Sequence, residues 1–262
     1  MGGPDQHSNE VFDAVGAGPA VVLLHAGIAD RRMWREHLGW IADSGHRVVA
    51  LDLPGFGEHV PSPQSLPPWE ATVAVMDDLG IGAAVVVGCS FGGAVALRLA
   101  VTAPDRVRAL ALISAPAPDM EPSARLHAVW TAETEAMERG DIDAAIDVVL
   151  AGWLAPDAPG ELRDLVASMQ RRAFELEAHG APEEPPDPVE HPQRLRDIAV
   201  PALVAAGEYD MPDFLSSAHT LAETLPGSSH QVIAGAGHLA PLERPAAFRS
   251  LLEQFLTSVD RR

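Results

Sequence analysis

The sequence predicts an α/β fold with a mostly parallel, doubly wound sheet. Short apolar runs rich in valine, leucine and alanine alternate with segments of helical periodicity towards both ends of the chain. This alternation favours parallel strands that are joined by right-handed crossovers. From residue 121 to about residue 179 the sequence shows helical periodicity but no strand candidate. We therefore predict one sheet whose two portions are separated by a helical insertion.

Length and composition agree with a single α/β domain. The chain has 262 residues, of which 47% are apolar, enough for a large buried core. Its formal net charge is −19 and its basic residues are scattered, so we expect neither nucleic acid nor a membrane surface as a partner. The one cysteine, Cys89, cannot form an internal disulfide. Since no secretory signal or membrane-spanning run is visible, we expect a cytoplasmic protein.

The first 120 residues alternate strands with helices. Residues 10–15 are a short strand candidate that ends at a Gly-Ala-Gly-Pro turn, and residues 20–24 form a continuous apolar run of strand length. The elements predicted after these are a helix at 33–42, a strand at 46–51, a helix at 69–79, a valine strand at 85–87 with a helix after it, and a strand at 107–113.

The second half of the chain begins with the insertion and then returns to alternation. Within the insertion, glycines and prolines break the helical pattern, and an acidic, proline-rich stretch at 183–188 predicts an extended linker. We assign residues 1–120 and 192–262 to the core domain and 121–191 to the insertion. The elements predicted after it are a strand at 201–206, a helix at 213–224, a strand at 231–234 and an amphipathic helix at 245–259.

A serine stands at the sharpest predicted turn of the chain. Gly88-Cys89-Ser90-Phe91-Gly92 fits the pattern G-x-S-x-G between a valine strand and an alanine-rich helix, the context that a nucleophile elbow requires. A side chain at position 88 or 92 would collide with the neighbouring strand or helix in so tight a turn. We expect Ser90 itself to have strained backbone angles, because a nucleophile elbow holds its serine at the apex.

A serine nucleophile needs a base and an acid that orients the base. His238 directly follows the strand at 231–234, and Asp210 follows the preceding strand, so both are placed at carboxyl strand ends, where sites form in open α/β sheets. The chain order Ser90, Asp210, His238 is the one expected when the elbow carries the nucleophile. Glu208 and Asp213 remain alternatives for the acid.

Backbone amides are suited to hold the negative charge that grows on a carbonyl oxygen under attack. The amide of Phe91 follows the nucleophile at a helix start, and the loop after residues 20–24 offers a second donor at Gly27 or at the neighbouring Ile28. We expect His25 in that loop to be structural, tying the loop together through hydrogen bonds.

Together these segments resemble the α/β-hydrolase fold superfamily, and within it a serine-nucleophile branch of small capped esterases and lactonases. The likeness runs from about residue 10 to residue 255, and the segments occur in the family's order. The segments that carry it are 23–27 with Trp34 (the oxyanion segment), 52–57 (Asp-x-x-Gly-x-Gly), 88–93 (the elbow), 207–210 (the acid) and 237–238 (the base).

The resemblance implies roles for individual residues. Ser90, Asp210 and His238 would be nucleophile, acid and base, and the amides of Phe91 and Gly27 would form the oxyanion hole. Serine at the nucleophile position disfavours the dehalogenase and epoxide-hydrolase branches, which use aspartate.

Two departures from the family pattern affect these expectations. Ala26 replaces the usual glycine after the histidine, which leaves the choice between Gly27 and Ile28 open. The short amino terminus predicts that the family's first antiparallel hairpin is reduced to one strand.

The resemblance also implies that the insertion is a helical cap, placed after the sixth strand and folded over the catalytic groups. Of eight large apolar residues near the site, we expect two or three to touch a ligand; they are Phe91, Trp130, Met137, Trp153, Leu154, Met169, Phe174 and Met211. Our predicted substrate contacts are Ile28, Trp130, Trp153, Met211 and Leu239. Arg171 and Arg172 could hold a substrate carboxylate, but we favour a solvated helix face for both, and the same for His127 and His179.

These observations predict a cofactor-independent serine hydrolase that cleaves a small, largely apolar carboxylic ester or lactone with water. No cluster has metal-ligand spacing, and no glycine-rich phosphate loop is present. The alternatives are a carbon–carbon bond hydrolase or a cofactor-free haloperoxidase with the same triad, and a non-catalytic small-ligand receptor. We expect a monomer or a homodimer.

Overall fold

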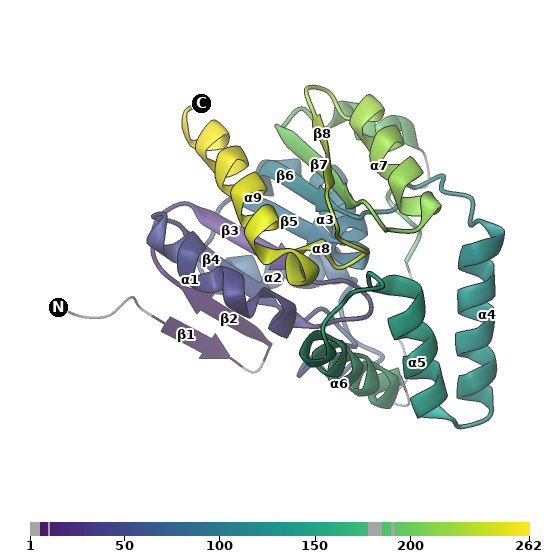
Figure 1. The fold of residues 1–262 in the computed structure, drawn as a ribbon. Helices are drawn as coiled ribbons and strands as arrows, with labels where there is room; N and C mark the ends of the chain where they lie inside the picture. The colour runs from purple at the N-terminus through teal and green to yellow at the C-terminus, as the bar shows by residue number, and fades with distance from the viewer. Residues whose placement is uncertain (1–5, 10, 178–184, 190–191) are drawn as a thin grey trace.

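The computed structural model describes residues 6–9, 11–177, 185–189 and 192–262. Across these residues, eight strands form one sheet in the order β1-β2-β4-β3-β5-β6-β7-β8 (Figure 1). Only β2 runs against its neighbours among the described strands, and every pair from β4 to β8 is parallel. The mostly parallel sheet predicted from the sequence is confirmed. The strands are β1 Gln6–Asn9, β2 Phe12–Val15, β3 Ala20–Leu24, β4 Arg47–Leu51, β5 Ala84–Cys89, β6 Val107–Ile113, β7 Ala202–Gly207 and β8 Ser229–Ile233.

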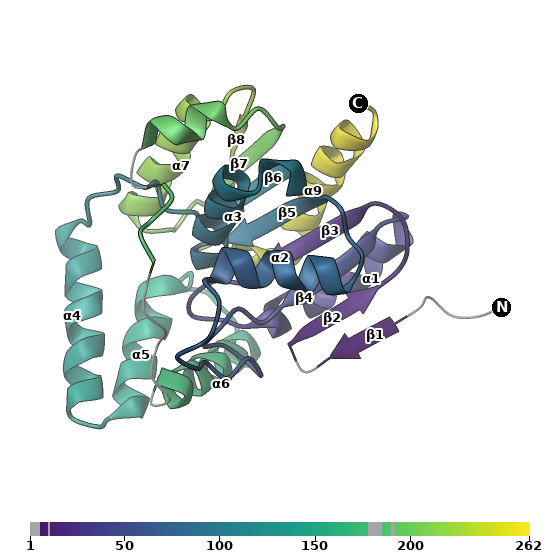
Figure 2. The same cartoon turned by 180° about the vertical axis from the view of Figure 1, so that it is seen from behind.

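Helices cover both faces of the sheet. The central strands β3 and β5 are apolar throughout and fully buried, as two-sided coverage requires. Helices α1 (Arg35–Asp43) and α9 (Pro245–Asp260) pack on one face (Figure 1), and α2 (Pro68–Asp78), α3 (Phe91–Thr102) and α7 (Pro212–Thr224) pack on the other (Figure 2). None of the described helices has the length and apolar character needed to span a bilayer.

Three further helices lie between β6 and β7 in the chain. They are α4 (Ala124–Glu138), α5 (Ile142–Trp153) and α6 (Gly160–Glu177), and they stand together at one end of the sheet (Figure 1). Their position after the sixth strand is the one predicted. Part of the predicted linker, residues 183–184, lies outside the described residues. The short elements are η1 Arg31–Trp34, η2 Pro104–Arg106, η3 Pro192–Asp197 and α8 Ala240–Glu243.

The prediction for the amino terminus was wrong. Instead of one strand at residues 10–15, an antiparallel hairpin is formed by β1 and β2, with Gln6 opposite Val15 and Asn9 opposite Phe12. The sequence of β1, Gln-His-Ser-Asn, has no apolar alternation, so the period of two that marks a strand is missing. Its place is defined by backbone pairing with β2, which side-chain patterning does not reveal.

A buried histidine in α1 should make the free energy of unfolding depend on pH. His37 is 1% exposed; its Nδ1 accepts a hydrogen bond from Trp40 Nε1, and its Nε2 donates to the Pro241 carbonyl at 3.0 Å. Burial lowers the pKa of His37 to about 4 and also lowers the pKa of His25. The unfolded chain therefore binds protons that the native chain does not once the pH falls below about 6.5.

We expect the free energy of unfolding to fall by about 1.4 kcal/mol per pH unit from His37 alone as the pH drops from about 6.5 towards 4. Urea unfolding at pH 6.5 and pH 5 measures this difference, and His37→Gln should reduce it by roughly 2 kcal/mol. The control is His219→Gln, on an exposed side chain. An equal pH dependence in the wild type and His37→Gln would contradict the assignment.

Candidate active site

The predicted elbow is formed as a sharp strand-to-helix turn. Ser90 lies between β5 and α3 with φ 50° and ψ −114°, in the positive-φ region that side chains normally avoid. The surrounding glycines allow this turn, because a Cβ atom on Gly88 would overlap the Gly92 carbonyl and one on Gly92 would overlap the Leu24 carbonyl. The steric expectation for positions 88 and 92 is confirmed, and the serine is held at the carboxyl end of the sheet.

His238 and Asp210 meet beside the elbow. Nδ1 of His238 lies 2.8 Å from Oδ1 of Asp210, and both side chains are at most 2% exposed. If the ring proton is on Nδ1, this N–H donates a hydrogen bond to the carboxylate, and Nε2 is left free to accept a proton. The two alternative acids are engaged elsewhere: Glu208 accepts from the Gly235 amide, and Asp213 accepts from Ser123.

Ser90 and His238 open onto the same cavity, which has a volume of about 650 Å³. This size lies in the range that takes small organic ligands. Of the ten predicted site residues, seven line it: Gly27, Ile28, Ser90, Phe91, Trp130, Trp153 and His238. Of the eight large apolar residues singled out from the sequence, three line it: Phe91, Trp130 and Trp153.

Met211 and Leu239 are placed differently from the prediction. Neither is among the residues that line the cavity, and both are fully buried in the core, at 1% and 0% exposed. Each follows a predicted triad residue in sequence, and a Cβ atom on Gly152 would lie 3.6 Å from Cε of Met211. The structure therefore corrects their assignment as substrate contacts. Asp210 also lies outside the lining, behind the imidazole that it orients.

His25 ties two loops together, as expected. Its Nε2 accepts a hydrogen bond from the Leu53 amide at 2.9 Å, and its Nδ1 lies 2.8 Å from the carbonyl oxygen of Ala26. Its own carbonyl accepts from the amide of Gly92, at the start of α3. With both ring nitrogens used by backbone groups, this imidazole has no free nitrogen for chemistry.

The two predicted oxyanion donors are close together. A Cβ atom on Gly27 would lie 3.5 Å from Cβ of Phe91. Within the part of the chain that the structure describes, the amides of Gly27, Ile28 and Phe91 have no hydrogen-bond acceptor. Ala26 is tolerated where the resemblance has glycine, because its φ is not in the positive region. The arrangement leaves free amides beside the serine.

The imidazole of His238 packs against two aromatic rings. Its ring centroid lies 4.5 Å from that of Trp153 in α5 and 4.4 Å from that of Phe214 in α7, and its amide donates to the Trp153 carbonyl at 3.0 Å. Phe214 was missed by the sequence analysis, although it lies one helical turn after Asp210. Next to the serine, burial raises the pKa of the Cys89 thiol well above its usual value, so this thiol stays protonated.

A model of the Alpha/beta hydrolase family matches residues 21–251. The chain belongs to this family. It is 32% identical to the dihydrolipoyllysine-residue acetyltransferase component of the acetoin cleaving system of Cupriavidus necator, over 92% of this chain but only 64% of that protein's length. It is also 32% identical to the 2-hydroxymuconate semialdehyde hydrolase of Pseudomonas putida, over 82% of this chain and 78% of the relative. Among solved structures, Est816, described as an N-acyl homoserine lactone degrading enzyme, matches with a TM-score of 0.76 and 25% identity, over 96% of this chain and 100% of the other.

Glu243 is a second residue of this chain that the sequence analysis missed. Its carboxylate is 5% exposed and accepts three backbone hydrogen bonds: from Gly237 at 3.1 Å and Leu239 at 2.9 Å, on either side of His238, and from Ala155 at 2.7 Å. One buried carboxylate therefore fixes the loop that carries the imidazole and joins it to the segment after α5. The signal was an acid five residues after the predicted base, in an otherwise apolar stretch.

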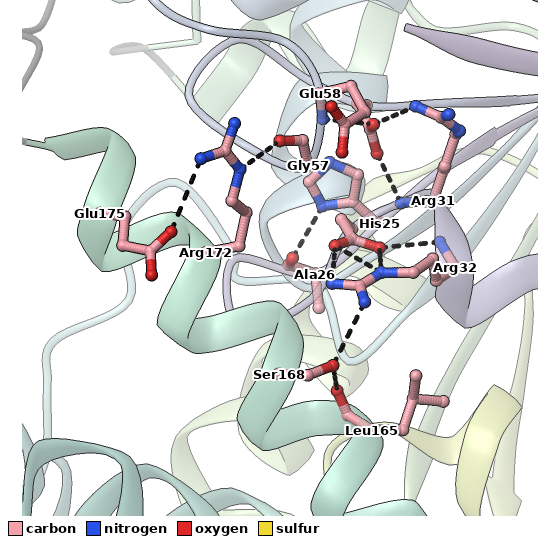
Figure 3. Close-up of polar contacts among 12 residues, drawn as sticks. His25, Ala26, Arg31, Arg32, Gly57, Glu58, Leu165, Ser168, Arg172 and Glu175 are labelled. Atoms are coloured by element: carbon pink, nitrogen blue, oxygen red, sulfur yellow. Dashed lines mark hydrogen bonds and ion pairs between the residues drawn. The ribbon is translucent and has the colours of Figure 1, made fainter. Parts of the chain in front are cut away.

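A charged junction connects α6 to the loops after β3 and β4 (Figure 3). Arg172 Nε donates to the Gly57 carbonyl at 3.0 Å, and Arg32 pairs with Asp30 and reaches Ser168 Oγ at 3.2 Å. The hydrogen bond to Asp30 raises the pKa of Arg32.

We predicted that Arg171 and Arg172 lie on a solvated helix face. Both arginines line this junction, and neither lines the Ser90 cavity. Arg171 pairs with Asp143 and Arg172 with Glu175, so neither is placed to hold a substrate carboxylate beside the serine. His127 packs edge-on against Trp130. His179 lies outside the described residues.

Proposed function

We propose that this chain is a serine hydrolase that cleaves carboxylic esters or lactones through an acyl-enzyme on Ser90. The observation that carries the proposal is the bonded His238–Asp210 pair, which opens with Ser90 onto one cavity. The similarity to a structure described as a lactone-degrading enzyme supports the choice of substrate class.

We infer the steps of the reaction from the chemistry of these groups. Nε2 of His238 takes the hydroxyl proton of Ser90 as Oγ bonds to the substrate carbonyl carbon, and the amides of Phe91 and Gly27 hold the oxyanion. The imidazolium, stabilised by Asp210, then gives its proton to the leaving alcohol oxygen as the carbon–oxygen bond breaks. Water, deprotonated by the same imidazole, attacks the acyl-enzyme and releases the acid with Ser90 restored. In a lactone, alcohol and acid stay in one molecule.

We propose that α4, α5 and α6 act as a cap in this reaction. They supply Trp130, Trp153 and Gln170 to the cavity lining, and the carbonyl of Trp153 accepts a hydrogen bond from the His238 amide. Packing of the cap on the imidazole would exclude bulk water, which strengthens each electrostatic interaction in the site. Substrate size would then be set by these helices.

A second candidate is hydrolysis of a carbon–carbon bond with the same three residues. It is favoured by the 32% identity to a 2-hydroxymuconate semialdehyde hydrolase over most of this chain. In this reaction the leaving group is a carbanion stabilised as an enolate, which needs a substrate with a conjugated carbonyl.

A substrate panel distinguishes the two candidates and the receptor alternative. The panel contains p-nitrophenyl esters of rising acyl length, γ- and δ-lactones, and a vinylogous diketone. We expect an ester or lactone to give the largest kcat/KM, with a decline once the acyl chain outgrows the cavity. Cleavage of the diketone alone would favour the carbon–carbon hydrolase, and inertness towards every compound would favour a receptor.

A further inference from the structure

Two acidic side chains line the Ser90 cavity. Glu133 of α4 and Glu177 of α6 both line it, and among the described lining residues there is no arginine. Burial raises the pKa of Glu133, with the charge of Glu177 adding to the effect, and burial also raises the pKa of Glu177. The charge of Glu177 therefore acts on Glu133, and no arginine among the described lining residues offsets the two carboxylates.

A buried amide in the same lining lacks a partner. Gln170 of α6 is 4% exposed, and its Oε1 has no hydrogen-bond partner among the described residues. An unpaired buried acceptor costs about 1–3 kcal/mol, so it is normally found where a ligand or water completes it. What Gln170 lacks is a hydrogen-bond donor.

An aromatic ring accompanies these acceptors. Trp130 lies three residues before Glu133 on α4, so the two share a helix face, and both line the cavity. The indole is 40% exposed, unusually high for a tryptophan. An aromatic face beside carboxylates is the combination that attracts an organic cation.

We propose that Trp130, Glu133, Gln170 and Glu177 form a subsite for a protonated amine of the substrate. The proposal rests on the proposed function, since the amine would belong to the ester or lactone whose carbonyl meets Ser90. The ammonium group donates to the Glu133 and Glu177 carboxylates, its carbon neighbours pack on Trp130, and the covered, unpaired Oε1 of Gln170 turns towards it when it binds. The net charge of −19 also favours the approach of a cation.

A matched pair of substrates tests the subsite. The p-nitrophenyl ester of trans-4-(aminomethyl)cyclohexanecarboxylic acid cannot cyclise, and the trans-4-ethyl analogue replaces its ammonium by a methyl group. We expect kcat/KM for the amine ester to exceed that for the ethyl ester by about tenfold or more. This ratio should fall towards unity in Glu133→Gln and rise with falling ionic strength in the wild type.

The control variant is Glu135→Gln, which removes the same charge from an exposed position on α4 that is outside the cavity lining. It should leave the ratio unchanged. A wild-type ratio of one or less, or equal ratios in Glu133→Gln and Glu135→Gln, would overturn the subsite even if both esters are hydrolysed.

Binding to Ser90→Ala separates this proposal from the proposed function. Calorimetric titration of that variant with each ester measures the subsite without turnover. Tighter binding of the amine ester, lost on adding Glu133→Gln, supports the subsite whether or not the wild type hydrolyses esters. Equal affinities for the two esters reject it.

Discussion

Replacing Asp210 by asparagine is expected to lower kcat for ester hydrolysis about 10⁴-fold, and replacing His238 by alanine by about 10⁵-fold or more, with KM changing little. Asparagine cannot stabilise the imidazolium, and its amide would favour the wrong tautomer of His238, whose Nδ1 lies 2.8 Å from the carboxylate. Alanine removes the base itself. Steady-state and single-turnover kinetics on the best ester of the panel measure both losses.

The control for Asp210→Asn is Glu208→Gln. Glu208 precedes Asp210 by two residues, but its carboxylate accepts a hydrogen bond from the Gly235 amide. Within the described residues, it has no recorded contact with the imidazole of His238. Its activity should stay within about threefold of the wild type. Full activity in Asp210→Asn together with inactivity in Glu208→Gln would move the acid to Glu208.

Replacing Glu243 by alanine is expected to lower the free energy of unfolding by about 3–5 kcal/mol, because three buried amide donors lose their acceptor at once. Two of those donors flank His238 and one comes from Ala155, so kcat should fall as well when the imidazole loop loosens. Urea unfolding measures the stability, and kcat at a temperature where the variant is folded measures the second effect.

Glu243→Gln and Glu253→Ala are the comparison variants for the stability of Glu243→Ala. Glutamine retains one acceptor oxygen, so its loss of stability should be intermediate. Glu253 lies on α9 and forms a surface ion pair with Arg249, so its removal should cost at most about 1 kcal/mol. An effect of Glu243→Ala no larger than that of Glu253→Ala would refute the proposed role of the buried carboxylate.

The sheet and the elbow were predictable from the sequence because their signals are local. Buried strands such as β3 and β7 are continuous apolar runs in the sequence, and glycines 88 and 92 mark a turn where backbone atoms approach too closely for a side chain. Ser90, Asp210 and His238 each follow a predicted strand, so all three could be assigned to strand ends from the sequence. Their order along the chain is the one expected for a nucleophile elbow.

What the sequence did not reveal depends on contacts between distant segments. Glu243 meets Ala155 across 88 residues of chain, and Trp153 meets His238 across the interface of α5 with the sheet. Met211 and Leu239 were predicted to touch substrate, but spacing along the chain does not determine in which direction a loop side chain points. The strand β1 was missed because only its pairing with β2 defines it.

Covalent labelling of Ser90 tests the central claim most directly. The wild type is treated with an active-site fluorophosphonate, and the adduct is counted by intact mass and located by peptide mapping. Ser114→Ala is the matched control, since Ser114 is a buried serine that also has φ 50°, at the end of β6. We predict one adduct per chain, on Ser90, in the wild type and in Ser114→Ala, and none in Ser90→Ala. Absence of labelling in folded wild-type protein, or undiminished labelling of Ser90→Ala, would contradict the account.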